Sequence, residues 1–187
     1  MSQSMSIEEH FFDPRNVGDA GEPSFVGRTA SVRCGATVRV SIQIDENHRI
    51  SQAKFRAAGC SSLVASLSML TERVTGMAPA DAAIACNSTT SLFPFSGAGD
   101  CAKLACDALV AAIQKYSDAA RDEWNGDDAL ICTCFCVSER VIESEVEKKE
   151  LKTVAEVTRA CNAGGGCGSC HPLIEEIIES VSSDRLY

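Results

Sequence analysis

The sequence lacks an excess of positive charge, a long apolar run and a secretion signal, and each absence excludes a class of protein. With 17 Lys and Arg against 26 Asp and Glu, the net charge is −9, whereas a nucleic-acid-binding surface needs clustered basic residues. No apolar run reaches the roughly 20 residues of a membrane-spanning helix. The start, MSQSMSIEEHFFDP, has no basic segment followed by an apolar one. We therefore expect a cytoplasmic protein that binds neither nucleic acid nor membrane.

Cysteine, by contrast, is abundant, with 11 among 187 residues. Disulfides are rare in a reducing cytosol, where clustered cysteines more often bind metal or carry out redox chemistry. The isolated Cys86 and Cys161 are expected to be small buried apolar residues. The remaining cysteines are Cys34, Cys60, Cys101, Cys106, Cys132, Cys134, Cys136, Cys167 and Cys170.

The first part of the chain predicts a small antiparallel sheet followed by helices. Residues 37–44, TVRVSIQI, alternate apolar and polar side chains as a half-buried strand does, and residues 50–59 form the second strand of a hairpin. Leu63, Leu67 and Leu70 recur at helical spacing. The other expected elements are a third strand within 24–33 and helices at 61–76, 79–86 and 100–124. This order indicates an α+β fold with a three-stranded sheet.

The predicted domain organisation is a first domain at 1–125, a linker at 126–131 and a second domain at 132–187. The segment NGDD is polar and turn-forming. Beyond it no strand pattern appears, and helical patterns occupy SERVIESEVEKKE, TVAEVTRAC and HPLIEEIIES. Thr153 and Glu156 stand in a capping-box arrangement. This all-helical module is small enough that a bound metal would help it fold.

Four cysteines of the second domain form a C-x-C and a C-x-x-C pair, namely Cys132, Cys134, Cys167 and Cys170. Four thiolates in two close pairs fit a zinc ion or a [2Fe–2S] cluster. The run AGGGCGSC would let the backbone pass close to a cluster. Zinc ribbons usually use two C-x-x-C pairs, and a thioredoxin-like dithiol would need a βαβ context, which is absent.

The segment from ICTCFC to GGGCGSC, about 40 residues, resembles the bacterioferritin-associated-ferredoxin-like [2Fe–2S] domain found in NifU proteins. The resemblance implies that all four of these cysteines ligate a permanent, redox-active [2Fe–2S] cluster. Cys136 departs from that family, which usually has glycine there, and it is not assigned as a ligand.

In the first domain, Cys34, Cys60 and Cys106 lie near predicted strand ends and helices, which gather at one end of an α+β domain. The motifs HFFDPRNVGD, RCGATVRVSIQID, FRAAGCSSLVASLSMLTERVTG and KLACDALVAAIQKY resemble the NifU/IscU-type iron–sulfur scaffold domain over roughly residues 9–118. The resemblance implies that these three cysteines hold a transient cluster or iron, with zinc as another occupant. Together the two parts resemble a NifU protein without the usual third, C-terminal domain.

Several positions depart from the scaffold family. Its Cys-Gly-Asp motif reads Cys-Gly-Ala here, with Ala36 in place of the carboxylate, and its His before the third cysteine is replaced by Ala105. A Leu-Pro-Pro-x-Lys segment is missing except for Lys103. Cys101 lies five residues before Cys106, so its place relative to the site is left open.

The sequence thus predicts an iron–sulfur assembly scaffold and carrier rather than an enzyme. Its expected partners are a cysteine desulfurase, an electron donor and apo-protein acceptors, and a homodimer is left open. Two alternatives are kept. One is an electron-transfer or redox-sensing [2Fe–2S] protein whose first domain does not transfer clusters, and the other is a zinc-binding structural module.

Overall fold

The computed structural model describes residues 7–87, 92–93, 99–123 and 128–184. The chain divides into two compact units, one of residues 1–77 and 85–115 and one of residues 78–84 and 116–187. The division falls within helices α3 and α5, so neither unit is one continuous stretch of chain. No helix in the described ranges combines the length and the apolar character needed to cross a membrane.

The first unit is built on a three-stranded antiparallel sheet in the order β1-β2-β3. The strands are β1 (Phe25–Ala30), β2 (Thr37–Ile44) and β3 (Ile50–Ala58). This confirms the predicted three-stranded antiparallel sheet. The alternation of side chains in β2 buries Val38, Val40 and Ile42 on the inner face.

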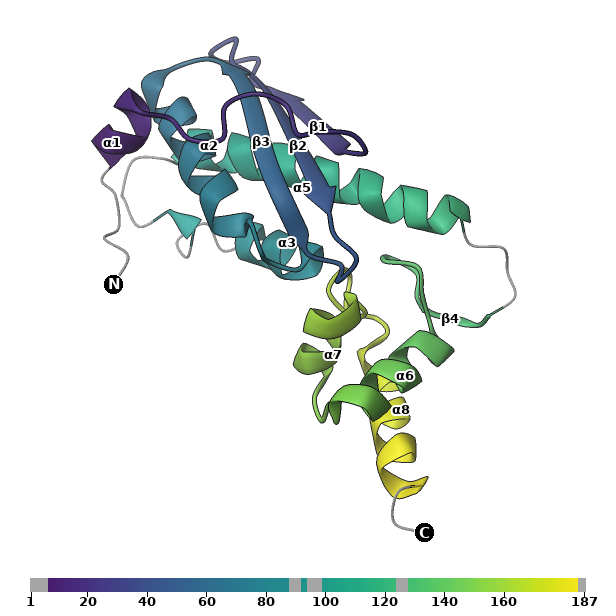
Figure 1. The fold of residues 1–187 in the computed structure, drawn as a ribbon. Coiled ribbons are helices and arrows are strands. Elements are labelled where there is room, and N and C mark those ends of the chain that lie inside the picture. The colour runs from purple at the N-terminus through teal and green to yellow at the C-terminus, as the bar shows by residue number, and fades with distance from the viewer. Residues whose placement is uncertain (1–6, 88–91, 94–98, 124–127, 185–187) are drawn as a thin grey trace. The chain divides into compact units, whose positions relative to one another are not determined.

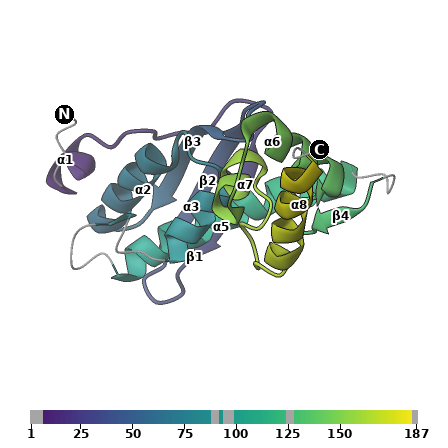
Figure 2. The same cartoon turned by 90° about the horizontal axis from the view of Figure 1, so that it is seen from below.

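Helices cover the inner face of this sheet (Figures 1 and 2). They are α2 (Ser61–Val74) and the first part of α5 (Gly99–Glu123), with α3 (Pro79–Asn87) between them in sequence. Leu63, Leu67 and Leu70 of α2 are fully buried. The hydroxyl of Thr29 in β1 donates to the Leu104 carbonyl of α5 at 3.1 Å.

A short helix that the sequence analysis did not predict, α1 (Ile7–Phe12), packs on α2. Its buried His10 Nδ1 lies 2.9 Å from the Ser68 hydroxyl. The chain then runs beside β3, where Gly18 N–H donates to the Phe55 carbonyl at 2.8 Å. One turn and a half of helix is too short to show a periodic pattern in the sequence.

The second unit contains α6 (Glu139–Lys149), α7 (Val154–Cys161) and α8 (His171–Asp184). Ile142, Val157 and Ile174, one from each helix, are fully buried. The predicted capping box at the start of α7 is confirmed, since the Thr153 hydroxyl accepts from Glu156 N–H and the Glu156 carboxylate accepts from Thr153 N–H.

The helical prediction for this unit missed a two-stranded antiparallel sheet. It pairs β4 (Leu130–Cys132) with β5 (Val137–Ser138). Strands of three and two residues are too short for a period-two pattern to be recognised. β4 begins inside the predicted linker at 126–131, of which residues 126–127 lie outside the described residues. The domain limits at 125 and 132 stay predictions.

Candidate metal centres

The four cysteines of the second unit come together in two pairs. Cys132 ends β4 and Cys134 follows in the turn to β5, whereas Cys167 and Cys170 lie in the loop before α8. The sulfur atoms of Cys134 and Cys167 are 3.5 Å apart. Cys132 and Cys170 are also within hydrogen-bonding contact of each other, and both are buried.

The glycine run that precedes Cys167 allows this loop to approach the turn that carries Cys134. A Cβ on Gly166 would lie 2.6 Å from Cys134 Cβ and 2.8 Å from its sulfur. Gly164 and Gly168 have φ values of +83° and +77°, which side chains disfavour. The glycines therefore let the loop of Cys167 reach the turn of Cys134.

The two cysteines of this loop have pKa values shifted in opposite directions. The Ser169 hydroxyl lies 2.9 Å from the Cys167 sulfur, and the hydrogen bonds from Ser169 lower the pKa of Cys167 to about 7. The Cys170 carbonyl accepts from Ile174 N–H at 3.0 Å, so Cys170 caps α8 and its side chain lies at the positive end of the helix dipole. Burial raises the pKa of Cys170 to about 11, so metal binding there must displace a proton.

This arrangement fits a [2Fe–2S] cluster. Such a cluster takes four thiolates, two at each iron, and the thiols here meet as two pairs. Zinc would instead draw all four sulfurs to about 2.3 Å from one point.

Two further cysteines of this unit, Cys136 and Cys161, lie outside the four-thiol arrangement. Cys136 has a φ of +53°, a left-handed conformation that glycine adopts more easily. Cys161 is buried and its thiol donates to the Val157 carbonyl at 3.3 Å. Cys161 is thus a small core residue, as predicted from its isolated position.

Replacing Gly166 by alanine should weaken this centre. The added methyl overlaps Cys134, so the loop and the turn must separate at a cost of about 1–3 kcal/mol in the free energy of unfolding. We expect a lower content of bound iron per chain and a lower thermal midpoint of the second unit. The matched control is Gly99→Ala, where a Cβ meets nothing within 4 Å. Equal iron content in the Gly166→Ala variant and the parent would contradict the close approach.

In the first unit, three thiols lie toward one end of the sheet, but Cys34, Cys60 and Cys101 are not grouped closely enough to enclose a single metal ion. Cys34 lies in the loop from β1 to β2 and is exposed. Cys60 is the exposed N-cap residue of α2, and Cys101 lies in the first turn of α5. The sulfurs of Cys60 and Cys101 are 3.5 Å apart. Burial and the hydrogen bond with Cys60 raise the pKa of Cys101 to about 11, and Cys34 also acts on it electrostatically.

The third cysteine that the sequence analysis selected, Cys106, is placed differently. It is 3% exposed, and its thiol pairs with Cys86, which α3 supplies. That hydrogen bond raises the pKa of Cys86 and lowers the pKa of Cys106. The structure therefore brings Cys60 to Cys101, and it brings Cys106 to Cys86. Cys86 is buried as predicted, and it has a thiol partner that its isolation in the sequence did not reveal.

Helix geometry accounts for this separation. Five residues along an α-helix correspond to a rotation of about 140°, so Cys101 and Cys106 project from different sides of α5. Cys106 belongs to the buried stripe with Leu109 and Ile113. Cys101 lies outside that stripe, in the first turn of α5. Cys60 lies similarly at the start of its helix, as the N-cap residue of α2. The helical spacing of Cys106, Leu109 and Ile113 in the sequence already indicates that the three share one face of the helix.

Comparison with known proteins connects this fold and these thiols to one family. The model of the NifU-like N-terminal domain matches residues 2–122. The chain belongs to this NifU-like family. The model of the BFD-like [2Fe–2S] binding domain matches residues 130–180.

The relatives of this NifU-like chain include longer proteins. It is 36% identical to the nitrogen fixation protein NifU of Nostoc sp. over 96% of this chain and 64% of the relative. It is 34% identical to the iron–sulfur cluster assembly scaffold protein IscU of Haemophilus influenzae, over 62% of this chain and 96% of IscU. The chain spans 58–64% of the length of the first NifU proteins it matches. A crystal structure of a hypothetical protein shares the fold, with a TM-score of 0.50 and 22% identity over 57% of this chain and 93% of that chain.

Proposed function

We propose that this NifU-like chain assembles an iron–sulfur cluster on Cys34, Cys60 and Cys101 and passes it to apo-proteins. The observation that supports this most strongly is the 3.5 Å contact between the Cys60 and Cys101 sulfurs. Both thiols reach solvent at the end of the sheet where Cys34 is also exposed. In this proposal Cys101 takes the role that the sequence analysis gave to Cys106.

The chemistry of these residues suits a cluster that is cargo. Three thiolates from one chain leave one coordination position open, and an exposed site lets a donor or an acceptor reach it. A hydrogen bond with Ser31 lowers the pKa of Cys34, which favours the metal-binding thiolate. With Cys101 as the third thiol, the residue before it is Asp100, whose carboxylate pairs with Arg33 at 2.9 Å.

In the second unit, Cys132, Cys134, Cys167 and Cys170 would hold a resident [2Fe–2S] cluster. That cluster, when bound, supplies one-electron redox chemistry. The chain provides a buried pair of thiols, Cys132 and Cys170, and a more exposed pair, Cys134 and Cys167, together with the glycine loop and the N-terminal end of α8. The proposed partners are a cysteine desulfurase as sulfur donor, an electron donor and apo-protein acceptors.

Position 36 should control how long the transient cluster stays. Ala36 is 3% exposed and adjoins Gly59, which precedes Cys60. A carboxylate there would offer a hard oxygen ligand or admit water, whereas the methyl group offers neither. We expect Ala36→Asp to accelerate cluster loss several-fold, measured as decay of visible absorption in the double variant with Cys167→Ser, which removes the colour of the second unit.

The control for that measurement is Ala36→Asn in the same background, which has a similar size without the charge. Faster decay in the aspartate variant alone would support the carboxylate route. Equal decay in both variants would assign the effect to disturbed packing around Ala36, and slower decay in the aspartate variant would contradict the prediction.

Anaerobic purification with iron and sulfide determination tests the proposal directly. The parent should contain iron and acid-labile sulfide in equal amounts. The iron and sulfide bound by its first unit should be transferred to an apo-ferredoxin. Zinc in place of iron would support a structural module. Iron that stays entirely with the chain would support the electron-transfer or redox-sensing alternative.

A further inference from the structure

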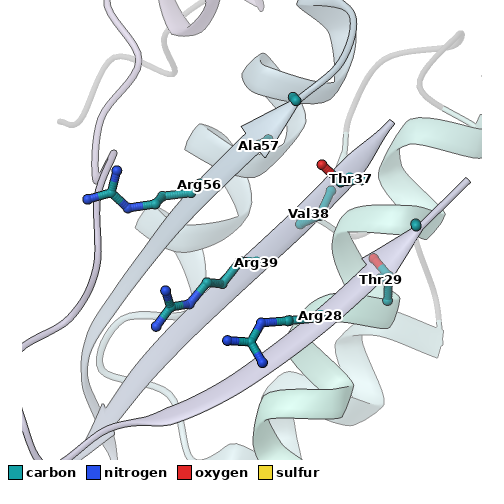
Figure 3. A pocket seen from close by; sticks show the side chains of 9 residues that line it. Arg28, Thr29, Thr37, Val38, Arg39, Arg56 and Ala57 are labelled. Carbon is teal, nitrogen blue, oxygen red and sulfur yellow. The ribbon is translucent and has the colours of Figure 1, made fainter. Parts of the chain in front are cut away.

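Three arginines form one row across the outer face of the sheet. Arg28 of β1 is the direct cross-strand partner of Arg39 in β2, and Arg39 is the partner of Arg56 in β3. Figure 3 shows the three side chains extending to the same side from neighbouring strands. The row stands out in a chain whose net charge is −9.

This row is costly to keep without an anionic partner, because like charges directly opposite each other destabilise a sheet. One carboxylate offsets part of the repulsion. Asp19 lies 3.3 Å from Arg39 and 2.6 Å from Arg56. Among the described residues Arg28 makes no ion pair, and the Nε of Arg39 is buried without a hydrogen-bond partner. The face thus keeps an excess of positive charge after its internal pairing.

The arginines border a surface groove of about 660 Å³. Its other lining residues are small and include Ala30, Thr37 and Ala58, so the groove has an apolar floor and a cationic side. These residues stand at the strand ends that lead to the thiols. The loop of Cys34 joins Ala30 to Thr37, and Cys60 follows Ala58 by two residues.

From this we infer that the groove is a docking surface for an acidic helix of a partner protein. Neighbouring strands are about 4.8 Å apart, and side chains at i and i+4 of a helix are about 5–6 Å apart. Glutamates at every fourth position could therefore each face one arginine of the row. A partner bound there would lie beside the end of the sheet that carries Cys34 and Cys60. The inference rests on the proposed function only where it places the partner beside the cluster-binding cysteines.

The test measures binding of a synthetic helical peptide with glutamate at every fourth position to the full chain, by fluorescence anisotropy. The matched control peptide has glutamine at the same positions. We expect the glutamate peptide alone to bind, with an affinity that falls as salt is raised. Arg28→Gln should weaken binding about threefold, and Lys115→Gln, an exposed charge on α5, should not. Without peptide, Arg28→Gln should not lower the thermal midpoint, because it relieves repulsion.

Equal binding of the two peptides, or binding that Arg28→Gln leaves unchanged, would overturn the inference. Arg28-dependent binding of inorganic phosphate or single-stranded DNA as tight as that of the glutamate peptide would assign the groove to phosphate and overturn it as well. Cluster assembly from ferrous iron and sulfide is measured on the same variant. If the parent assembled no cluster, the proposed function would be contradicted. We expect Arg28→Gln to assemble a cluster as the parent does, so that a failure of peptide binding can be told apart from a failure of cluster assembly.

Discussion

A chain in which Cys167 is replaced by serine should lose the [2Fe–2S] cluster of its second unit. Cys167 is exposed and contacts the Cys134 sulfur at 3.5 Å, so the substitution removes a ligand while disturbing little packing. A serine oxygen is a poor substitute for a soft thiolate at iron. The iron and the visible absorption assigned to this unit should fall to near zero. Its thermal midpoint should fall as well, because a small helical module gains much of its stability from a bound cofactor.

Cys161→Ser is the matched control, because serine can still donate to the Val157 carbonyl as the Cys161 thiol does. This variant should keep its iron and its colour. If Cys167→Ser retained the full absorption, or if zinc replaced iron in the parent, the assignment of this centre would be wrong.

The second large effect is expected at Cys101. Cys101→Ser should abolish cluster assembly on the first unit, because it removes the thiol that contacts Cys60. Cys106→Ser should leave assembly largely intact, since Cys106 is buried against Cys86. Assembly would be followed by visible absorption after addition of ferrous iron and sulfide, in a Cys167→Ser background that is colourless at the start.

Both substitutions lie on α5, so their contrast separates a ligand from a core residue of the same helix. A thermal melt provides the control, because Cys106→Ser places a hydroxyl in a buried pair and should cost about 1–3 kcal/mol in the free energy of unfolding. Assembly that failed in Cys106→Ser and persisted in Cys101→Ser would restore the ligand set predicted from the sequence.

The elements with strong periodic patterns could be predicted from the sequence. The strand at 37–44 has the predicted limits, because four alternating apolar residues fix both its length and its buried face. The leucines of α2 and the capping box of α7 are equally local signals. The short elements α1, β4 and β5 were missed, because they depend on tertiary packing rather than on a pattern of their own.

The candidate sites show a similar limit. The pairs C-x-C and C-x-x-C drew attention to the four cysteines of the second unit, whose thiols the structure brings into contact, because each pair belongs to one short loop. The proposed first centre takes residues from three separate parts of the chain. The preference for Cys101 over Cys106 in that proposal depends on the rotation of α5 about its axis, which the sequence motif does not give. The arginine row depends on strand register, which places Arg28, Arg39 and Arg56 side by side although they are far apart in the sequence.

The central claim is tested most directly by following isotopically labelled iron from this chain to an apo-ferredoxin. The first unit of the full chain is loaded with labelled iron and sulfide while the second unit already holds unlabelled iron. We predict that the label moves to the acceptor, that the unlabelled iron stays, and that Cys101→Ser abolishes the transfer. An acceptor that receives no label, or that receives it equally from Cys101→Ser, would contradict the account.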